Sequence, residues 1–440
     1  MSTIDPNPPS GTRDFLPDEV ARRERAFATI RETFQRHGFE PLDTPAFERL
    51  EVLTGKYGEE GDQLIFKILR RGEHEATGEA DHALRYDLTV PLARVAARYG
   101  SQLPTPFKRY QIAPVWRADR PGKGRYREFF QCDVDTIGSD SPLADAATIV
   151  AVADVLDRLG LSGFRVQLNH RRALAGLIEA YGVPASLESS TLTALDKLDK
   201  IGPDGVAAEL TEREIPHAAV RALTEDLAAD DLEAVVRERL AGTERGRLGL
   251  EELDRVLELI GTVPGGQVGY APVLARGLSY YTGTVFEVVH EGLEATIAAG
   301  GRYDGLIGMF QGQDVPATGG SLGLERILLL LERAETEART HIGPEVLVTV
   351  LDDEAGPDAL AIAGRLREHG LRAEPYVGGG SRKLGKQLRY ADRRGVRAAV
   401  IRGAEERATG RVAVKDLASG EQVTVDDAEL TAHLDRLLGS

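Results

Sequence analysis

Residues 105–137 read TPFKRYQIAPVWRADRPGKGRYREFFQCDVDTI, and they predict two strands joined by a loop at ADRPGKG. Side chains alternate between the two faces of a strand, so the second strand places Gln131, Asp133 and Asp135 on one face. The residues between them, such as Cys132, are apolar and form the other face. The pattern favours a site for a charged ligand, and ordinary half-exposed alternation is the alternative.

Basic residues are concentrated in the same stretch. Seven of them stand between positions 108 and 127 against one acid, Asp119. They are Lys108, Arg109, Arg117, Arg120, Lys123, Arg125 and Arg127. Planar guanidinium groups suit phosphate oxygens, so arginines beside carboxylates suggest that a cation and an anion bind together, as an amino acid and a nucleoside triphosphate would. A hairpin held by salt bridges is the alternative.

The whole chain is acidic. Its 440 residues include 54 Lys and Arg against 70 Asp and Glu, which gives a net charge of −16. This excludes a protein-wide basic surface for nucleic acid but permits a local one, because salt screens charges beyond about 8 Å. The length and the 42% hydrophobic content predict a large core in two or three domains and exclude global disorder.

The sequence lacks features that several kinds of site and cellular location require. The single cysteine, Cys132, rules out an intrachain disulfide and a cysteine-based zinc site. Neither of the common glycine-rich phosphate loops occurs. Residues 1–6 lack the basic and apolar regions of a secretory signal. No uncharged apolar run approaches the ~20 residues that a membrane span needs. We expect a cytoplasmic protein with no membrane contact.

Hydrophobic periodicity and turn residues predict the organisation of the rest of the chain. We expect helices over 18–37, 142–160 and from 323 onward, short strands over 84–99, and strands over 39–48, 163–168, 268–290 and 294–310. The predicted domains are a core in two parts, 1–170 and 261–335, a helical insertion at 171–260, a linker at 336–344 and a small α/β domain at 345–440. Prolines 41 and 45 predict that the strand 39–48 lies at a sheet edge. That edge could form a dimer contact, or it could be an ordinary edge strand.

Three further stretches attract attention. In residues 84–89, LRYDLT, alternation would place Arg85, Asp87 and Thr89 on one side, where a carboxylate and a hydroxyl could accept from an ammonium group. In residues 274–289, LARGLSYYTGTVFEVV, Arg276 precedes two adjacent tyrosines, Tyr280 and Tyr281. The alternative is that both tyrosines are ordinary core aromatics. The glycines of residues 319–326, GGSLGLER, would allow a flat ring to approach the backbone closely. The alternative is an ordinary glycine-containing turn between a strand and a helix.

Taken in order, these stretches resemble the class II aminoacyl-tRNA synthetases and, within them, the histidyl-tRNA synthetase family. GFEPLDTPAFE resembles the first class II motif, WRADRPGKGRYREFFQCDVD the second and GGSLGLERILLL the third. LRYDLTVPLAR and LARGLSYYTGTVFEV resemble segments peculiar to the histidine enzymes, and the likeness extends through the C-terminal part. The resemblance implies an α+β fold: a class II antiparallel sheet flanked by helices, with a helical insertion and a C-terminal α/β anticodon-binding domain.

The resemblance also implies an activity. L-Histidine would react with ATP to give histidyl-adenylate and pyrophosphate, and the histidyl group would pass to the 3′ end of tRNA(His). Mg²⁺ would accompany ATP without a dedicated protein site, and the enzyme would be a homodimer. Arg117 and Arg276 would be catalytic. The implied ATP-binding residues are Arg117, Arg125, Arg276 and Arg326.

The same resemblance supplies the histidine-binding residues. They are Asp87, Leu88, Thr89, Arg117, Gln131, Asp135, Arg276, Tyr280 and Tyr281. Asp87, Thr89 and Gln131 would bind the ammonium group, while Asp135 and Tyr281 would bind the two imidazole nitrogens, with Tyr280 adjacent. Family members often have glutamate at the position of Asp135. A site built on such polar pairs rejects apolar isosteres by roughly 10⁴–10⁵, so no editing domain is needed.

A basic helix is predicted within residues 381–397, SRKLGKQLRYADRRGVR. Arg382, Lys386, Arg389 and Arg393 fall at helical spacing on one face, while leucines fall on another. A solvated face is the ordinary reading. The resemblance instead implies tRNA contacts by Arg382, Lys383, Lys386, Arg389 and Arg393.

Three other functions compete with this one. A synthetase-like regulatory subunit of histidine biosynthesis would bind histidine without charging tRNA, but that family lacks the C-terminal domain and has a degraded Arg276 segment. A class I synthetase is suggested only by residues 341–344, HIGP, which lie in the linker. A plain RNA-binding protein would have no use for arginines around an amino-acid pocket.

Overall fold

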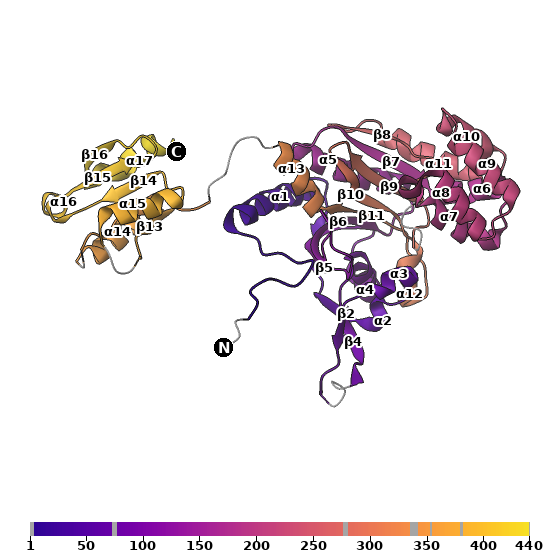
Figure 1. Ribbon diagram of the computed structural model, residues 1–440, viewed down its shortest axis with the longest axis horizontal. Helices are drawn as coiled ribbons and strands as arrows, with labels where there is room; N and C mark the ends of the chain where they lie inside the picture. The colour runs from indigo at the N-terminus through magenta and orange to yellow at the C-terminus, as the bar shows by residue number, and fades with distance from the viewer. Residues whose placement is uncertain are drawn as a thin grey trace. The chain divides into compact units, whose positions relative to one another are not determined.

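The computed structural model describes residues 4–72, 77–275, 280–334, 342–352, 354–378 and 382–439, which form two compact units (Figure 1). The first unit comprises residues 1–15 and 23–337, and the second comprises 16–22 and 338–440.

The first unit is built on a mixed sheet of eight strands among the described residues, in the order β1-β5-β6-β11-β10-β9-β7-β8. The strands are β1 Glu40–Pro41, β5 Phe107–Trp116, β6 Glu128–Ile137, β7 Phe164–His170, β8 Gly266–Tyr270, β9 Thr284–His290, β10 Leu293–Arg302 and β11 Ala317–Gly323. The predicted α+β fold with a flanked sheet is confirmed. The sheet is antiparallel except at its two edges, where β1 pairs with β5 and β8 with β7 in parallel.

One face of this sheet carries the main hydrophobic core. Helices α1 (Pro17–Arg36), α5 (Pro142–Arg158), α11 (Glu244–Ile260) and α13 (Leu324–Ala334) supply apolar side chains to it. Cys132 and Val134 of β6 point into this layer and are fully buried. The alternation predicted for the second strand is therefore confirmed on its apolar side. Helix α5 begins where predicted, because Ser141 caps it by accepting from the backbone N–H of Leu143.

The other face is covered by a second hydrophobic cluster and a small sheet. Helices α2 (Leu50–Leu53), α4 (Thr89–Tyr99) and α12 (Gly305–Gln311) contribute to this cluster, and α3 spans Gly58–Gln63. The small sheet has the order β2-β4-β3, with β2 Phe47–Arg49, β3 Lys67–Leu69 and β4 Ala80–Leu84. Because this cover is partial, the polar side of β6 opens into a cavity.

The predicted helical run 171–260 is confirmed as six helices. They are α6 Arg171–Ala180, α7 Glu188–Leu195, α8 Leu198–Glu212, α9 His217–Leu227, α10 Leu232–Ala241 and α11. Helices α6 to α10 form a separate core of their own, against which Leu250 of α11 also packs. Helix α6 packs closely against α11, where Gly249 lies against the backbone of Ala173. Figure 1 shows these helices gathered beyond β7 and β8.

The second unit is a small α/β domain with the sheet order β13-β12-β14-β15-β16. Its strands are β12 Val346–Val348, β13 Ala373–Pro375, β14 Ala398–Ile401, β15 Arg411–Asp416 and β16 Gln422–Asp426, and its helices are α14 Ala355–Glu368, α15 Leu384–Arg393, α16 Ala404–Thr409 and α17 Leu430–Leu438. The first five elements after residue 344 alternate as predicted. Across the described residues, no helix has both the length and the apolar character that crossing a membrane requires.

Four predictions of secondary structure were wrong. The strand expected over 268–290 is two strands, β8 and β9, and the described residues 271–275 and 280–283 between them form neither strand nor helix. Residues 89–99 form helix α4 and not short strands, because Asp87 accepts a hydrogen bond from the N–H of Val90 and so satisfies a free donor of the first turn. Residues 39–48 are divided between β1 and β2, which belong to different sheets. Residues 305–311 form helix α12, where strand was expected.

Candidate active site

A cavity of about 400 Å³ lies on the polar side of the central strands. Eight residues singled out from the sequence line it: Asp87, Thr89, Arg117, Gln131, Asp135, Tyr280, Tyr281 and Arg326. They come from segments that are up to 239 residues apart in the chain, between Asp87 and Arg326. The fold therefore brings most of the predicted site residues to one hollow.

Strand register brings these segments together. Asp135 of β6 lies opposite Arg109 of β5 on one side and Gly319 of β11 on the other. Asp133 lies opposite Ser321 in the same way. Gly319 has to be glycine here, because a Cβ atom at that position would come within 1.9 Å of Oδ1 of Asp135. The glycines of residues 319–323 thus leave room for the carboxylates of the neighbouring strand.

Arg117 and Asp87 stand on one wall of the cavity. The Arg117 guanidinium donates to the backbone oxygen of Tyr86 at 3.0 Å and to the side-chain oxygen of Gln131 at 3.3 Å. It also lies over the Tyr86 ring, 4.3 Å from the ring centroid. Asp87 accepts from the hydroxyl of Tyr57 at 2.9 Å. These contacts fix a cation and an anion side by side.

Asp135 is held at both carboxylate oxygens. Its Oδ1 accepts from the Tyr303 hydroxyl at 2.5 Å, and its Oδ2 lies 2.9 Å from Nη2 of Arg109. Asp135 is 2% exposed. The side chain thus has one defined orientation at the floor of the cavity.

Burial makes the cavity unfavourable for negative charge. It raises the pKa values of Asp87, Asp133 and Asp135, and the pKa of Asp133 rises to about 7 because the charge of Asp135 adds to the burial. Burial also raises the pKa values of Tyr280 and Tyr281, so both phenols stay protonated. Three acidic groups and protonated phenols suit a ligand that carries a positive charge and ring nitrogens.

Several predicted residues lie elsewhere or cannot be placed. Leu88 is fully buried beside Ala113 and Val115 and does not line the cavity. The Arg125 side chain is 58% exposed and pairs with Asp119 at 2.8 Å. Arg276 falls outside the described residues. Among those that are described, no group of three His, Cys, Asp or Glu side chains could hold a metal ion.

The structure adds lining residues to which the sequence analysis assigned no binding role, including Tyr57, Tyr86, Asp133, Tyr303 and Ser321. Asp133 had a usable signal, since it shares the polar face of Gln131 and Asp135. Tyr57 and Tyr303 had none, because nothing in their local sequence places them near β6.

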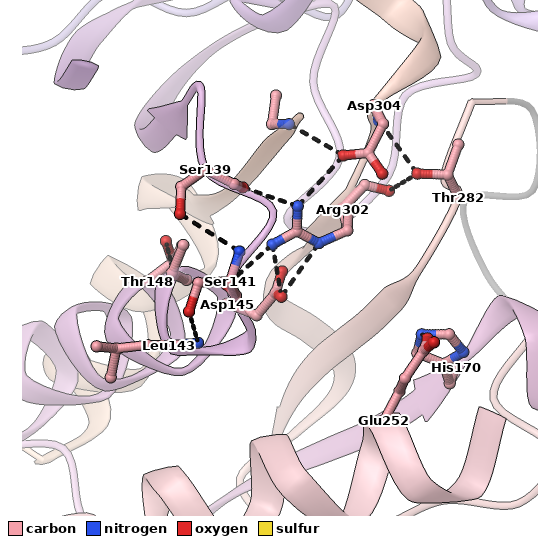
Figure 2. A network of polar contacts seen from close by, with 12 residues as sticks. Ser139, Ser141, Leu143, Asp145, Thr148, His170, Glu252, Thr282, Arg302 and Asp304 are labelled. Carbon is pink, nitrogen blue, oxygen red and sulfur yellow. Dashed lines mark hydrogen bonds and ion pairs between the residues drawn. The ribbon is translucent and has the colours of Figure 1, made fainter. Parts of the chain in front are cut away.

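The residue before Tyr303 in the chain, Arg302, lies at the centre of the network in Figure 2. Arg302 is 8% exposed and donates to Asp145 of α5 through Nε at 3.1 Å and Nη2 at 2.8 Å. The same guanidinium reaches the backbone oxygens of Ser139 and Ser141. These bonds tie the end of β10 to the start of α5. The backbone that carries Tyr303 is thereby fixed.

In the second unit, the predicted basic residues are all exposed. Lys386, Arg389 and Arg393 lie on α15, whereas Arg382 and Lys383 precede it. The helix is anchored by Gln387, which is fully buried and exchanges hydrogen bonds of 2.7 and 2.9 Å with the backbone of Val350. The basic face is thus presented by an ordered helix.

Comparison with known proteins decides the family. A family model described as histidyl-tRNA synthetase matches residues 11–327, and one described as anticodon binding domain matches residues 345–437. The chain belongs to the histidyl-tRNA synthetase family. As a member of this family, it is an aminoacyl-tRNA ligase, and the predicted family membership is confirmed.

Relatives of this synthetase match it over nearly its whole length. A histidine–tRNA ligase of Gloeobacter violaceus is 43% identical, with 94% of each chain covered. A histidine–tRNA ligase of Aeropyrum pernix is 41% identical, with 99% of each chain covered. The crystal structure of a histidyl-tRNA synthetase from Nostoc sp. PCC 7120 matches with 33% identity and a TM-score of 0.79, covering 99% of this chain and 100% of that one.

A structure from Bacillus halodurans titled as an ATP phosphoribosyltransferase regulatory subunit/histidyl-tRNA synthetase is 24% identical, with a TM-score of 0.72 over 88% of this chain and 97% of that one. At that identity the likeness shows the fold alone.

Proposed function

We propose that the cavity is where histidine and ATP react in this histidine–tRNA ligase. A carboxylate oxygen of histidine attacks the α-phosphorus of ATP, the bond to the bridging oxygen breaks, and pyrophosphate leaves. The 3′-terminal ribose hydroxyl of tRNA(His) then attacks the carbonyl carbon of the adenylate, releasing AMP and a proton. The observation that carries the proposal is that Arg117 and Arg326 line the same hollow as three buried carboxylates.

The ammonium group of histidine would bind between Asp87, Thr89 and Gln131. Asp87 is 4% exposed and already accepts from Tyr57 and from the Val90 N–H. The ammonium group would give this buried carboxylate a positively charged partner. A hydrogen bond to a charged group contributes about 1.5–3 kcal/mol to binding. Binding would therefore favour the ionised form of Asp87.

The imidazole ring would lie between Asp135 and Tyr281. The carboxylate of Asp135 can accept from a ring N–H, and the protonated phenol of Tyr281 can donate to the other nitrogen. Tyr280 packs against Tyr281 with ring centroids 4.8 Å apart. A ring without these nitrogens would leave both protein groups unpaired, which is why we expect strong discrimination against apolar side chains.

The phosphates of ATP would be bound by arginines. Charge develops on the phosphoryl oxygens in the first step, and fixed cations there lower the barrier. Arg117 would contact the histidine carboxylate and the α-phosphate, with Arg276 approaching from the other side, while Arg326 and Arg125 would serve the outer phosphates. Arg125 would have to leave Asp119 to do so. We expect Mg²⁺ to enter with the triphosphate.

Histidine-dependent ATP–pyrophosphate exchange tests the proposal. We expect exchange with histidine and not with phenylalanine or leucine. Arg117→Ala should lower the rate by on the order of 10²–10³, whereas Arg255→Ala, on the exposed face of α11, should leave it unchanged. Exchange without amino-acid preference, or full activity in Arg117→Ala, would show that the cavity has another role.

We further propose that the basic face of the second unit contacts tRNA(His) through Arg382, Lys383, Lys386, Arg389 and Arg393. Affinity for tRNA falls as salt concentration rises, and each phosphate contact makes the slope of log affinity against log salt concentration steeper by about 0.7–0.9. Lys386→Ala with Arg389→Ala should therefore weaken tRNA binding and flatten the salt dependence, while pyrophosphate exchange persists. An unchanged salt slope would refute these contacts.

We also propose that the enzyme is a homodimer and that it acts in the cytoplasm. The short strand β1 pairs with β5 and forms one edge of the large sheet, and unpaired sheet edges favour further association. Sedimentation equilibrium should give twice the 47.6 kDa chain mass. A species of single chain mass at micromolar concentration would exclude the dimer.

A further inference from the structure

Arg109 lies directly beneath the floor of the cavity and is not among the residues that line it. It is 0% exposed and is the largest fully buried side chain among the described residues. Strand pairing sets it opposite Asp135. Arginine is almost never fully buried unless it is paired, so this position calls for an explanation.

The pairing of Arg109 is incomplete. Nη2 lies 2.9 Å from Oδ2 of Asp135 and donates to the backbone oxygen of Leu88 at 3.2 Å. Nε and Nη1 have no hydrogen-bond partner in the described part of the chain, and Oδ2 of Asp135 accepts no hydrogen bond there either. Each unpaired buried group costs about 1–3 kcal/mol. The fold thus keeps an arginine where an apolar side chain of similar volume would be less costly.

The charge of Arg109 acts on every carboxylate of the cavity. Burial raises the pKa values of Asp87, Asp133 and Asp135, and Arg109 opposes that rise at each of the three. In Asp135 the effect is most direct, because the ion pair is in contact. Without this buried cation, the carboxyl group of Asp135 would more readily take up a proton and lose its charge.

The geometry around Asp135 is completed from the opposite side. Tyr303 donates to Oδ1, and the network of Arg302 in Figure 2 fixes the backbone beside it. Oδ1 is therefore occupied by a hydrogen bond, whereas Oδ2 is buried from solvent and faces the guanidinium of Arg109. The two contacts together fix the orientation of the whole carboxylate.

We infer that Arg109 is a positioning residue for histidine recognition: by its ion pair it fixes where the carboxylate of Asp135 lies for contact with the imidazole N–H, without itself touching the substrate. The inference rests on the proposed role of Asp135. It explains how an aspartate serves where family members often have the longer glutamate, since a shorter side chain needs a partner that fixes where its carboxylate lies.

The test compares Arg109→Met and Arg109→Lys with the wild-type enzyme in pyrophosphate exchange, titrating histidine and ATP separately. We expect Arg109→Met to raise the KM for histidine by on the order of 10²-fold and to leave the KM for ATP unchanged. Arg109→Lys, which restores the charge, should recover part of the loss. Arg165→Met, an exposed arginine on β7 of the same sheet, is the matched control.

A double-mutant cycle with Asp135→Asn separates positioning from general destabilisation. If Arg109 acts through Asp135, the double variant should bind histidine no more weakly than Asp135→Asn alone. Additive losses, or equal rises in both KM values for Arg109→Met, would overturn the inference. If Asp135→Asn itself leaves the KM for histidine unchanged, the proposed imidazole contact is wrong and the inference falls with it. Absence of histidine-dependent exchange in the wild type would instead refute the proposed function.

Discussion

Replacing Gly319 with alanine should displace the carboxylate that we assign to imidazole recognition. The added Cβ would lie 1.9 Å from Oδ1 of Asp135 and 2.6 Å from its Cγ, whereas ordinary contact begins at 3.4 Å. The carboxylate would therefore have to move by about 1.5 Å. Arg109 and Tyr303 hold it on the other sides, so it cannot swing away without breaking one of these contacts.

The size of the effect follows from this displacement. A misplacement of about 1 Å in a recognition group can lower the rate by on the order of 10², which corresponds to about 2.7 kcal/mol. We expect the loss to fall on the KM for histidine in ATP–pyrophosphate exchange, with the KM for ATP close to that of the wild type. Thermal unfolding of the variant should be recorded alongside, to show that it is folded.

Gly269→Ala is the matched control for this variant. Gly269 lies on β8 of the same sheet, and a Cβ there would meet nothing within 4 Å. The control should therefore bind histidine as the wild type does. A folded Gly319→Ala enzyme with an unchanged KM for histidine would refute the reasoning, because the carboxylate would then have no fixed part in binding.

Three other predictions concern the same site and its support. Burial raises the pKa of Asp133 from 3.8 to about 7, so the folded chain binds a proton in this window that the unfolded chain has released, and the free energy of unfolding falls as pH rises through it. Asp133→Asn should thus be more stable than the wild type at pH 8 and not at pH 4 in urea unfolding; an equal difference at both pH values would contradict this. Arg302→Met should lower the free energy of unfolding by about 3–5 kcal/mol because it leaves the buried Asp145 without its cationic partner, and a loss below about 1 kcal/mol would show that the pair is dispensable. Tyr57→Phe removes the hydroxyl that donates to Asp87 and should raise the KM for histidine about tenfold, whereas Tyr99→Phe, on the half-exposed end of α4, should not.

The sequence alone determined the elements whose signals are local. Alternation along residues 128–137 separated Gln131, Asp133 and Asp135 from the apolar side chains between them, because successive side chains of a strand point to opposite faces. Hydrophobic periodicity over residues 142–160 predicted helix α5 for a similarly local reason. The family likeness then collected eight lining residues that no local pattern could have joined.

Only the tertiary structure decided which arginine lines the cavity and which lies buried beneath it. Arg109 and Arg117 stand on and just beyond the same strand and look alike in the sequence, yet one is sealed beneath the cavity and the other lines it. Their difference depends on what covers each position: Arg109 is fully buried and donates to the backbone oxygen of Leu88, whereas Arg117 follows the end of β5 and lines the cavity. Such cover comes from segments distant in the chain, and no local pattern encodes it.

Register between distant strands decided the rest. Gly319 meets Asp135 and Ser321 meets Asp133 only because β11 pairs with β6 across more than 180 residues of chain. Tyr303 reaches Asp135 because the network of Arg302 fixes the end of β10. A shift of one residue in this pairing would turn each side chain to the other face. The local sequence therefore specifies which residues can share a face, and the packing of the whole domain specifies which of them meet.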